Sequence, residues 1–182
     1  MNKPLKYLLT TPLLFTLCLS GCGNFEMNGP ETVGIGENHT EEIFKKVISS
    51  NLDIPLVGGN RDLVENKGGT IDFDMDIPGL DDEMKRDIKN GEMVAHAMNG
   101  NLLSSYVLDI EDSVDIDDFT NKLQENIKNE HWLCGVPEKL SIVDIENDYI
   151  VYTYGDTELV DLFTKEIRTH IDTANLLIEL NL

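Results

Sequence analysis

The stretch KLSIVDIENDYIVYTYGD, residues Lys139–Asp156, decides the fold class of this chain. Its apolar runs Lys139–Ile145 and Tyr149–Tyr154 flank the polar triplet Glu146-Asn147-Asp148. Two apolar runs around a short polar segment indicate a pair of antiparallel strands. Asp156 or Thr157 is then expected to begin a helix. The stretch therefore predicts a strand-strand-helix unit.

A second unit of the same kind precedes it. Glu92–Met98 and Leu102–Ile110 are predicted strands, joined at Asn99-Gly100, a pair typical of a type I′ hairpin turn. Asp115 or Asp117 begins a helix whose apolar residues recur every four positions, namely Phe119, Leu123 and Ile127. The repeated order predicts an α+β fold, with an antiparallel sheet of two hairpins and the helices packed on one face.

Helices are also expected at both ends of a single domain spanning residues 40–182. Asn38 or Thr40 can cap a helix through about Ser50. The last helix is expected to start near Asp156 or Thr157 and to reach at least Ile178. It carries the apolar residues Leu159, Val160, Phe163, Ile167, Ile171, Ala174 and Ile178.

Residues 1–21 have the features of a leader. Lys3 and Lys6 give a positive start, and the apolar run Tyr7–Leu19 is too short to span a membrane. Small residues then precede a cysteine in Leu19-Ser20-Gly21-Cys22. This order resembles the bacterial lipoprotein signal peptide, which is removed before the cysteine. The resemblance implies a lipid anchor on Cys22, at the extracytoplasmic face of the cell membrane.

Residues 22–39 are interpreted as the lipidated cysteine and a flexible tether, rich in Gly and Asn. Cys18 leaves with the leader, so Cys134 is the only unmodified cysteine expected in the mature chain, and no intrachain disulfide can form. The formal net charge is −20. Such acidity makes nucleic acid a poor partner and opposes contact with anionic lipid, so the lipid group alone is expected to hold the protein at the membrane.

Several segments of the mature chain carry a further resemblance. They are TEEIFKKVISS (Thr40–Ser50), SSYVLDIED (Ser104–Asp112), the helix through NEHW (Asn129–Trp132) and NDYIVYTYGD (Asn147–Asp156). Together they resemble a family of small lipoproteins of unknown function from clostridia-like Gram-positive bacteria, except that a longer loop is expected before LSSYVL. The resemblance implies an α+β fold and surface attachment, and it implies no catalytic residues.

The stretch DFDMDIPGLDDE, Asp72–Glu83, admits two interpretations. An EF-hand loop would place Asp72, Asp74, Asp76 and Glu83 around calcium, but Ile77 stands where that loop requires glycine. A strand would alternate the three exposed aspartates with the inward-facing residues Ile71, Phe73, Met75 and Ile77. The strand accounts for every residue up to the stop at Pro78-Gly79, and we favour it.

Other metal sites receive less support. The run Asp109–Asp118 is dense in carboxylates and is interpreted as a loop and a helix N-terminus. His131-x-x-Cys134 lacks the further ligands that zinc needs. Trp132, Leu133 and Cys134 are instead expected to pack into the core, with Cys134 as a buried thiol. No metal and no other cofactor is predicted.

The sequence shows no nucleophile elbow, no placed Cys–His pair and no phosphate-binding glycine loop. It therefore predicts a non-catalytic binding or accessory module, held at the membrane through Cys22. Its partner would be an unknown envelope protein or ligand, bound by an exposed patch that includes Tyr152 and Tyr154. The alternative is an unrecognised cell-envelope hydrolase, which requires a concave pocket with a perturbed His or carboxylate.

Overall fold

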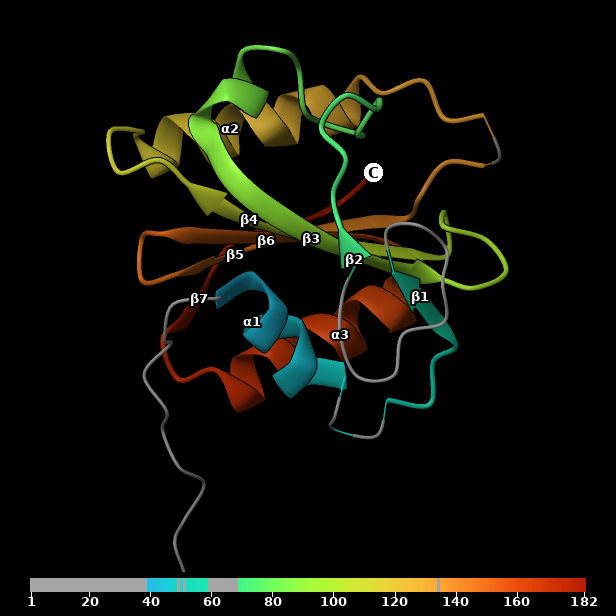
Figure 1. Cartoon of the computed structure of the whole chain (residues 1–182). Coiled ribbons are helices and arrows are strands. Elements are labelled where there is room, and N and C mark those ends of the chain that lie inside the picture. Colours follow the sequence, from blue (N-terminus) through green and yellow to red (C-terminus); the bar gives the residue numbers. More distant parts are fainter. Residues whose placement is uncertain (1–38, 49, 51, 59–68, 134) are drawn as a thin grey trace, which may run out of the picture. The chain divides into compact units, whose positions relative to one another are not determined.

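The computed structural model describes residues 39–48, 50, 52–58, 69–133 and 135–182 (Figure 1). In this part of the chain the helices are α1 (His39–Ile48), α2 (Ile116–Lys128), α3 (Thr157–His170) and the short 3-10 helix η1 (Met84–Asp87). The strands are β1 (Leu56–Gly58), β2 (Gly69–Thr70), β3 (Ile88–His96), β4 (Leu103–Ile110), β5 (Lys139–Ile145), β6 (Tyr149–Gly155) and β7 (Ala174–Asn181). They form one seven-stranded antiparallel sheet, so the α+β class is confirmed.

Some expectations concern residues outside these ranges. The leader, Cys22 and its tether up to residue 38 are among them, and so is the burial of Cys134. Among the helices that the structure describes, none has the length and apolar character that a membrane span needs.

Two hairpins, β3–β4 and β5–β6, form the centre of the sheet. They join through antiparallel pairing of β4 with β6, in which Tyr106 lies opposite Tyr152. The strand order is β1-β3-β4-β6-β5-β7, and β2 pairs with β3. Strand β7 pairs with β5, where Ile178 lies opposite Ile142. The predicted hairpins are thus the two halves of one continuous sheet.

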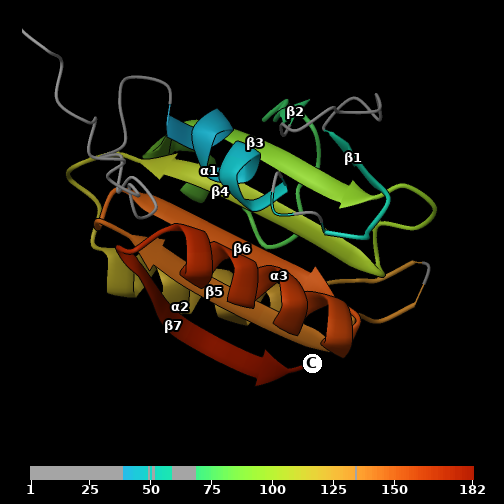
Figure 2. The same cartoon turned by 90° about the horizontal axis from the view of Figure 1, so that it is seen from below.

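Helices cover both faces of this sheet, which corrects the expectation that they pack on one face. Helix α2 and residues 71–87 lie on one face, and α1 and α3 lie on the other (Figures 1 and 2). Strand β6 shows the reason: Ile150 and Tyr152 join the core under α2, whereas Val151 joins the core under α1 and α3. Alternate residues of a strand point to opposite faces, so a strand that is apolar throughout needs a cover on each.

Side-chain caps set the starts of α2 and α3 as the sequence predicted. Asp115 Oδ1 accepts the backbone N–H of Asp118 at 3.0 Å. Asp156 Oδ1 accepts the backbone N–H of Glu158 at 3.0 Å. These bonds satisfy donors that the first turn of a helix leaves unpaired. The predicted apolar stripe of α2 is buried, with Phe119, Leu123 and Ile127 all in the core.

The last helix is shorter than predicted, because residues 174–181 form a strand. Helix α3 ends at His170, and Ile171 takes the extended angles φ −129° and ψ 101°. The apolar spacing of this region suits a helix, but β7 places Leu176 and Ile178 against the cores on opposite faces of the sheet. Pairing with β5 therefore outweighs the local helical pattern.

Residues 71–77 form an irregular segment with a turn, and the predicted strand is absent from it. Asp72 Oδ1 accepts the backbone N–H of Asp74 at 3.1 Å, which stabilises a turn in place of an extended strand. Met75, which was expected to face inward, is 63 % exposed. Ile71 and Ile77 are buried as expected.

The turns of the two hairpins also differ from expectation. Asn99-Gly100 has no positive φ, and the connection between β3 and β4 extends over residues 97–102. Positive φ angles occur instead at Glu146 and Asn147, with values of 62° and 60°. A type I′ turn requires positive φ at both central residues. The second hairpin therefore has the turn that the sequence predicted for the first.

Candidate functional site

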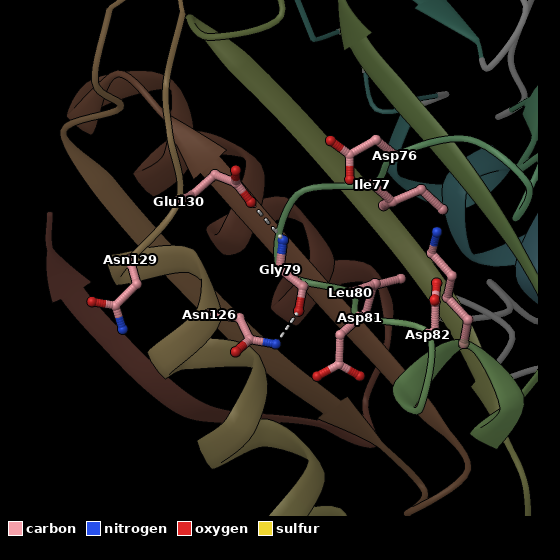
Figure 3. A pocket seen from close by; sticks show the side chains of 10 residues that line it. Asp76, Ile77, Gly79, Leu80, Asp81, Asp82, Asn126, Asn129 and Glu130 are labelled. Atoms are coloured by element: carbon pink, nitrogen blue, oxygen red, sulfur yellow. Dashed lines mark hydrogen bonds between the residues drawn. The ribbon is translucent and has the colours of Figure 1, made fainter.

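An open cleft of about 460 Å³ lies between the loop after residue 75 and the C-terminal end of α2 (Figure 3). Most of the residues that line it are polar. They are Asp76, Ile77, Gly79, Leu80, Asp81, Asp82, Lys85, Asn126, Asn129 and Glu130. Carboxylates outnumber the lysine, so the cleft favours a cationic group over an anionic one.

Gly79 fastens this loop to α2. Its φ is +86°, and a Cβ at this position would lie 2.7 Å from Leu123 Cδ1. The Gly79 N–H donates to Glu130 Oε2 at 3.4 Å, and the Gly79 carbonyl accepts from Asn126 Nδ2 at 3.0 Å (Figure 3). Glycine alone combines this backbone conformation with so close an approach. The polar groups at the centre of the cleft thus hold the backbone in place.

The charged groups beside Gly79 are engaged in the same way. Asp81 Oδ1 accepts the backbone N–H of Met84 at 2.9 Å, and Asp81 Oδ2 lies 3.1 Å from Lys122 Nζ. The hydrogen bond from Met84, with help from Lys122, lowers the pKa of the Asp81 carboxyl. Lys85 Nζ donates to the carbonyl of Met75 at 2.7 Å. These contacts stabilise the loop and leave fewer groups for a ligand.

No hydroxyl, thiol or imidazole side chain lines the cleft, because Ser, Thr, Cys, His and Tyr are missing from its walls. Among the sequence candidates, Asp76 lines the cleft, whereas Asp72 and Asp74 lie on an exposed turn. His131 is exposed and directly follows Glu130, but it is not among the lining residues. Within the described part of the chain, no three His, Cys, Asp or Glu side chains are grouped so as to hold a metal ion. Asn126, Glu130 and Asp81 use their polar groups in this cleft to hold the backbone of the loop in place.

A second hollow, of about 360 Å³, lies beside the end of β3. Met93, Met98 and Ser104 are among the residues that line it, together with His96. His96 Nδ1 accepts the backbone N–H of Met98 at 3.3 Å, so a neutral ring carries its proton on Nε2. Methionine side chains adapt to apolar groups of different shapes. The hollow thus combines adaptable apolar side chains with the polar groups of His96 and Ser104.

The hollow adjoins a surface that we call the uncharged end, formed by loop 97–102 and by the described residues of loop 131–137, which are 131–133 and 135–137. The loops meet where Asn101 Nδ2 donates to the carbonyl of Gly135 at 2.7 Å. Neither loop contains Asp, Glu, Lys or Arg, although these residues make up 26 % of the chain. Both loops expose large apolar side chains, with exposed fractions of 84 % for Met98, 96 % for Leu133 and 66 % for Val136. Exposed apolar groups that gather in this way mark interaction surfaces.

The exposure of Leu133 corrects the expectation that it packs into the core. Trp132 does pack there, with its ring 4.9 Å from that of Tyr154. Tyr106 continues the stack, at 4.6 Å from Tyr152 and nearly parallel to it. Tyr152 and Tyr154, which were expected on an exposed patch, are both buried in the core. Burial raises the pKa of Tyr152 well above its ordinary value, so its hydroxyl remains a donor.

The opposite end of the sheet, which we call the acidic end, consists of residues 109–118 and the turn 146–148. The two segments meet where the Ile110 N–H donates to the carbonyl of Asp148 at 2.8 Å. Burial raises the pKa of the neighbouring Asp144 carboxyl, and repulsion from Asp148 adds to this shift. The capping role of Asp115 confirms that the acidic run contains a helix N-terminus.

Loops 97–102 and 131–137 were not predicted to form one surface. Their lack of charge is visible in the sequence, but their proximity depends on pairing between the hairpins. Gly155 lies opposite Leu103 on one side and opposite Lys139 on the other, which brings the two loops together. A search for long uncharged loops in an acidic chain could have found both, though not their contact.

Comparison of the chain with protein-family models, curated proteins and solved structures finds no match. The function of the chain therefore has to be inferred from its own residues.

Proposed function

We propose that this protein is a lipoprotein, anchored through Cys22 at the extracytoplasmic face of the cell membrane, that works as a non-catalytic binding module. In this proposal the uncharged end docks onto a partner protein. The observation that carries it is the group of exposed apolar side chains in loops 97–102 and 131–137. They stand on a packed aromatic base, in a protein whose formal net charge is −20.

The position of His39 supports this proposal. The described chain begins there, at the acidic end, because Thr40 Oγ1 donates to Asn90 Oδ1 at 3.2 Å and Asn90 Nδ2 donates to Asp109 Oδ2 at 3.0 Å. From this end β3 runs for 9 residues, or about 30 Å, toward the uncharged end. A tether that enters at His39 is thus attached far from the uncharged end, which stays accessible to a partner.

The charges around the uncharged end indicate the chemistry of the partner. Segments 52–58 and 155–157 border it, as the hydrogen bond from the Ala97 N–H to the carbonyl of Pro55 at 2.7 Å illustrates, and so do Glu130 and Glu138 next to loop 131–137. These parts of the chain contain no Lys or Arg but carry the carboxylates of Asp53, Glu130, Glu138 and Asp156. An apolar protein surface with Lys or Arg at its margin complements this arrangement, whereas an anionic bilayer is repelled.

A cell-envelope hydrolase is the alternative, since the cleft next to Gly79 contains carboxylates of the kind that glycoside hydrolysis uses. However, Glu130 and Asp81 accept hydrogen bonds that hold the surrounding loop. A general acid or base needs a carboxyl group that can reach the substrate. The binding module therefore has the better support.

Site-specific photo-crosslinking on intact cells tests the proposal. A photoreactive amino acid is placed at Leu133 or Val136, and a matched control carries it at Asp112 of the acidic end, where the side chain is 87 % exposed. We expect the same protein to be captured from Leu133 and from Val136 and not from Asp112. The captured peptide should be apolar with Lys or Arg beside it, and added salt should lower the yield.

Other outcomes count against the proposal. Adducts with lipid at Leu133 would assign the uncharged end to the membrane. Equal capture of the same protein from Asp112 would show that binding is not specific to the uncharged end. If no adduct forms at Leu133 or Val136 in cells where the chain is fully exported, the uncharged end does not bind a partner protein, and the proposal is wrong.

A further inference from the structure

The dipeptide Asn-Gly occurs at two places in the described part of the chain, Asn90-Gly91 and Asn99-Gly100. In such a pair the backbone nitrogen of glycine can attack the side-chain carbonyl of asparagine, because glycine has no side chain to hinder the approach. The reaction also requires a backbone that can bring the two atoms together. The two Asn-Gly pairs differ in how well their surroundings meet this requirement.

Asn99 is exposed in loop 97–102, outside the sheet. The backbone N–H of Asn101 donates to Asn99 Oδ1 at 3.0 Å. This donor points at the oxygen on which negative charge develops when the amide carbon is attacked. A Cβ at Gly100 would contact only Ser104 Oγ, at 3.3 Å, so the space around Gly100 is open.

Asn90 lies within β3, and its amide is held at both atoms. Asn90 Nδ2 donates to Asp109 Oδ2 at 3.0 Å, and Asn90 Oδ1 accepts from Thr40 Oγ1 at 3.2 Å. Gly91 is buried in the sheet, where a Cβ would lie 2.9 Å from the carbonyl oxygen of Val107. Reaction at this pair requires the strand to open first.

We propose that Asn99 is a site of spontaneous deamidation in the folded protein, with the Gly100 nitrogen as nucleophile. The Gly100 N–H gives its proton to solvent, and the nitrogen forms a bond to Asn99 Cγ. The Cγ–Nδ2 bond breaks, and ammonia leaves with the proton it needs. Water then opens the cyclic imide at either of its two C–N bonds, which yields aspartate or isoaspartate at this position.

The reaction needs no oxidant and consumes only water. It raises the mass of the chain by about 1 Da and places a carboxylate in the middle of loop 97–102. The surface that lacks charge thus acquires one as the protein ages. Any effect on partner binding rests on the proposed function, whereas the modification of Asn99 does not.

Peptide mass mapping of the purified full-length chain, aged in its folded state at mildly alkaline pH, tests the proposal. We expect conversion at Asn99 to be at least about tenfold faster than at Asn90, because the strand must open before Asn90 can react. In concentrated urea the two sites should convert at similar rates. Gly100→Ala should suppress conversion at Asn99 and leave Asn90 unchanged, and it is compatible with the fold because Gly100 has no positive φ.

The proposal is overturned if Asn99 stays intact in the folded chain while it converts in urea. Equal rates at Asn99 and Asn90 in the folded chain would also overturn it, since the structural difference would then have no effect. Both outcomes are read from the unsubstituted protein, so neither depends on how the Gly100→Ala variant folds.

Discussion

The acidic end and the uncharged end belong to the same sheet but present opposite surfaces to solvent. At the acidic end the carboxylates have local structural roles: Asp115 caps α2, and Lys89 Nζ lies 3.6 Å from Asp109. At the uncharged end Leu133 is almost fully exposed beside Trp132, which rests on Tyr154. Charged residues keep most of such a surface soluble, so a loop pair without them is a candidate surface for contact with another molecule. The contrast makes the uncharged end, and neither of the two hollows, the surface on which the proposed partner should be sought.

Loss of the anchor should have the largest effect, because it should abolish attachment of the protein to the membrane. It also tests the basis for the proposed orientation of the two ends. Cys22→Ser removes the thiol that would receive the lipid, so we expect unlipidated, unprocessed precursor in place of the mature form. Fatty-acid labelling and intact mass measure this outcome. If the Cys22→Ser chain is still cleaved after Gly21 and still carries lipid, the anchor is elsewhere, and the position of His39 no longer indicates the orientation of the two ends.

Removal of the aromatic support should destabilise the protein. Trp132→Ala takes away the ring that packs on Tyr154. Because Trp132 is only partly buried, we expect the free energy of unfolding to fall by about 2–3 kcal/mol, at or below the lower limit of the range for fully buried aromatic residues. Urea unfolding followed by circular dichroism measures it. Trp132→Phe keeps an aromatic ring and should lose less than about half as much. A loss below about 1 kcal/mol for Trp132→Ala would mean that the stack does not support the uncharged end.

A charge placed on the uncharged end should weaken partner binding and spare the fold. Leu133 is 96 % exposed, so Leu133→Asp should change the free energy of unfolding by less than about 0.5 kcal/mol. Binding to the crosslinked partner should weaken by about ten- to a hundredfold. Leu162→Asp, on α3 and away from both ends, is the matched control and should leave binding unchanged. If both variants lose the same amount of binding affinity, the uncharged end is not the interface.

At the acidic end, a substitution that removes a charge should slightly increase the stability of the protein. The folded state raises the pKa of Asp144 above its ordinary value of 3.8, chiefly through burial. Between these two pKa values the Asp144 carboxyl binds more protons in the folded chain than in the unfolded chain, so its own contribution to stability is greatest in acid and falls as pH rises through the folded pKa. Asp144→Asn keeps an acceptor for the Asn147 N–H and removes the charge, so it should stabilise the protein at neutral pH by up to about 1 kcal/mol.

Urea unfolding at a series of pH values measures this effect, and Asp112→Asn is the contrasting variant. The hydrogen bond from Lys89 lowers the pKa of Asp112, so that carboxyl contributes stability that is lost as pH falls through its folded pKa. The two substitutions should therefore change the pH profile in opposite directions. A profile that Asp144→Asn leaves unaltered would show that the burial of this carboxyl does not cost stability.

Features that depend on neighbours in the chain could be predicted from the sequence. Asp115 and Asp156 cap helices through backbone groups two or three residues away, so both were found. The strands of each hairpin were found for the same reason. Strand β7 was missed because its apolar residues also fit a helix, and only pairing with β5 decides between them. Residues 71–77 alternate as a strand does, but Asp72 bonds the following backbone and makes a turn.

The site was less predictable than the fold. Tyr152 and Tyr154 were placed on the surface because a strand pattern does not reveal whether its second face is covered, and here α2 and Trp132 cover it. The lack of charge in loop 97–102 could be read from the sequence, but its contact with Gly135 follows from long-range pairing of strands.

The position of Trp132 gives the molecule an optical property. It is the only tryptophan in the chain, and it lies 4.9 Å from Tyr154 at the base of loop 131–137. Excitation absorbed by the stacked residues Tyr106, Tyr152 and Tyr154 passes to the indole over such short distances, so the tryptophan emission originates at one end of the sheet. A partner that covers Leu133 would change this emission, and an ion that binds near Asp148 would not. The protein thus reports the state of its uncharged end without an added label.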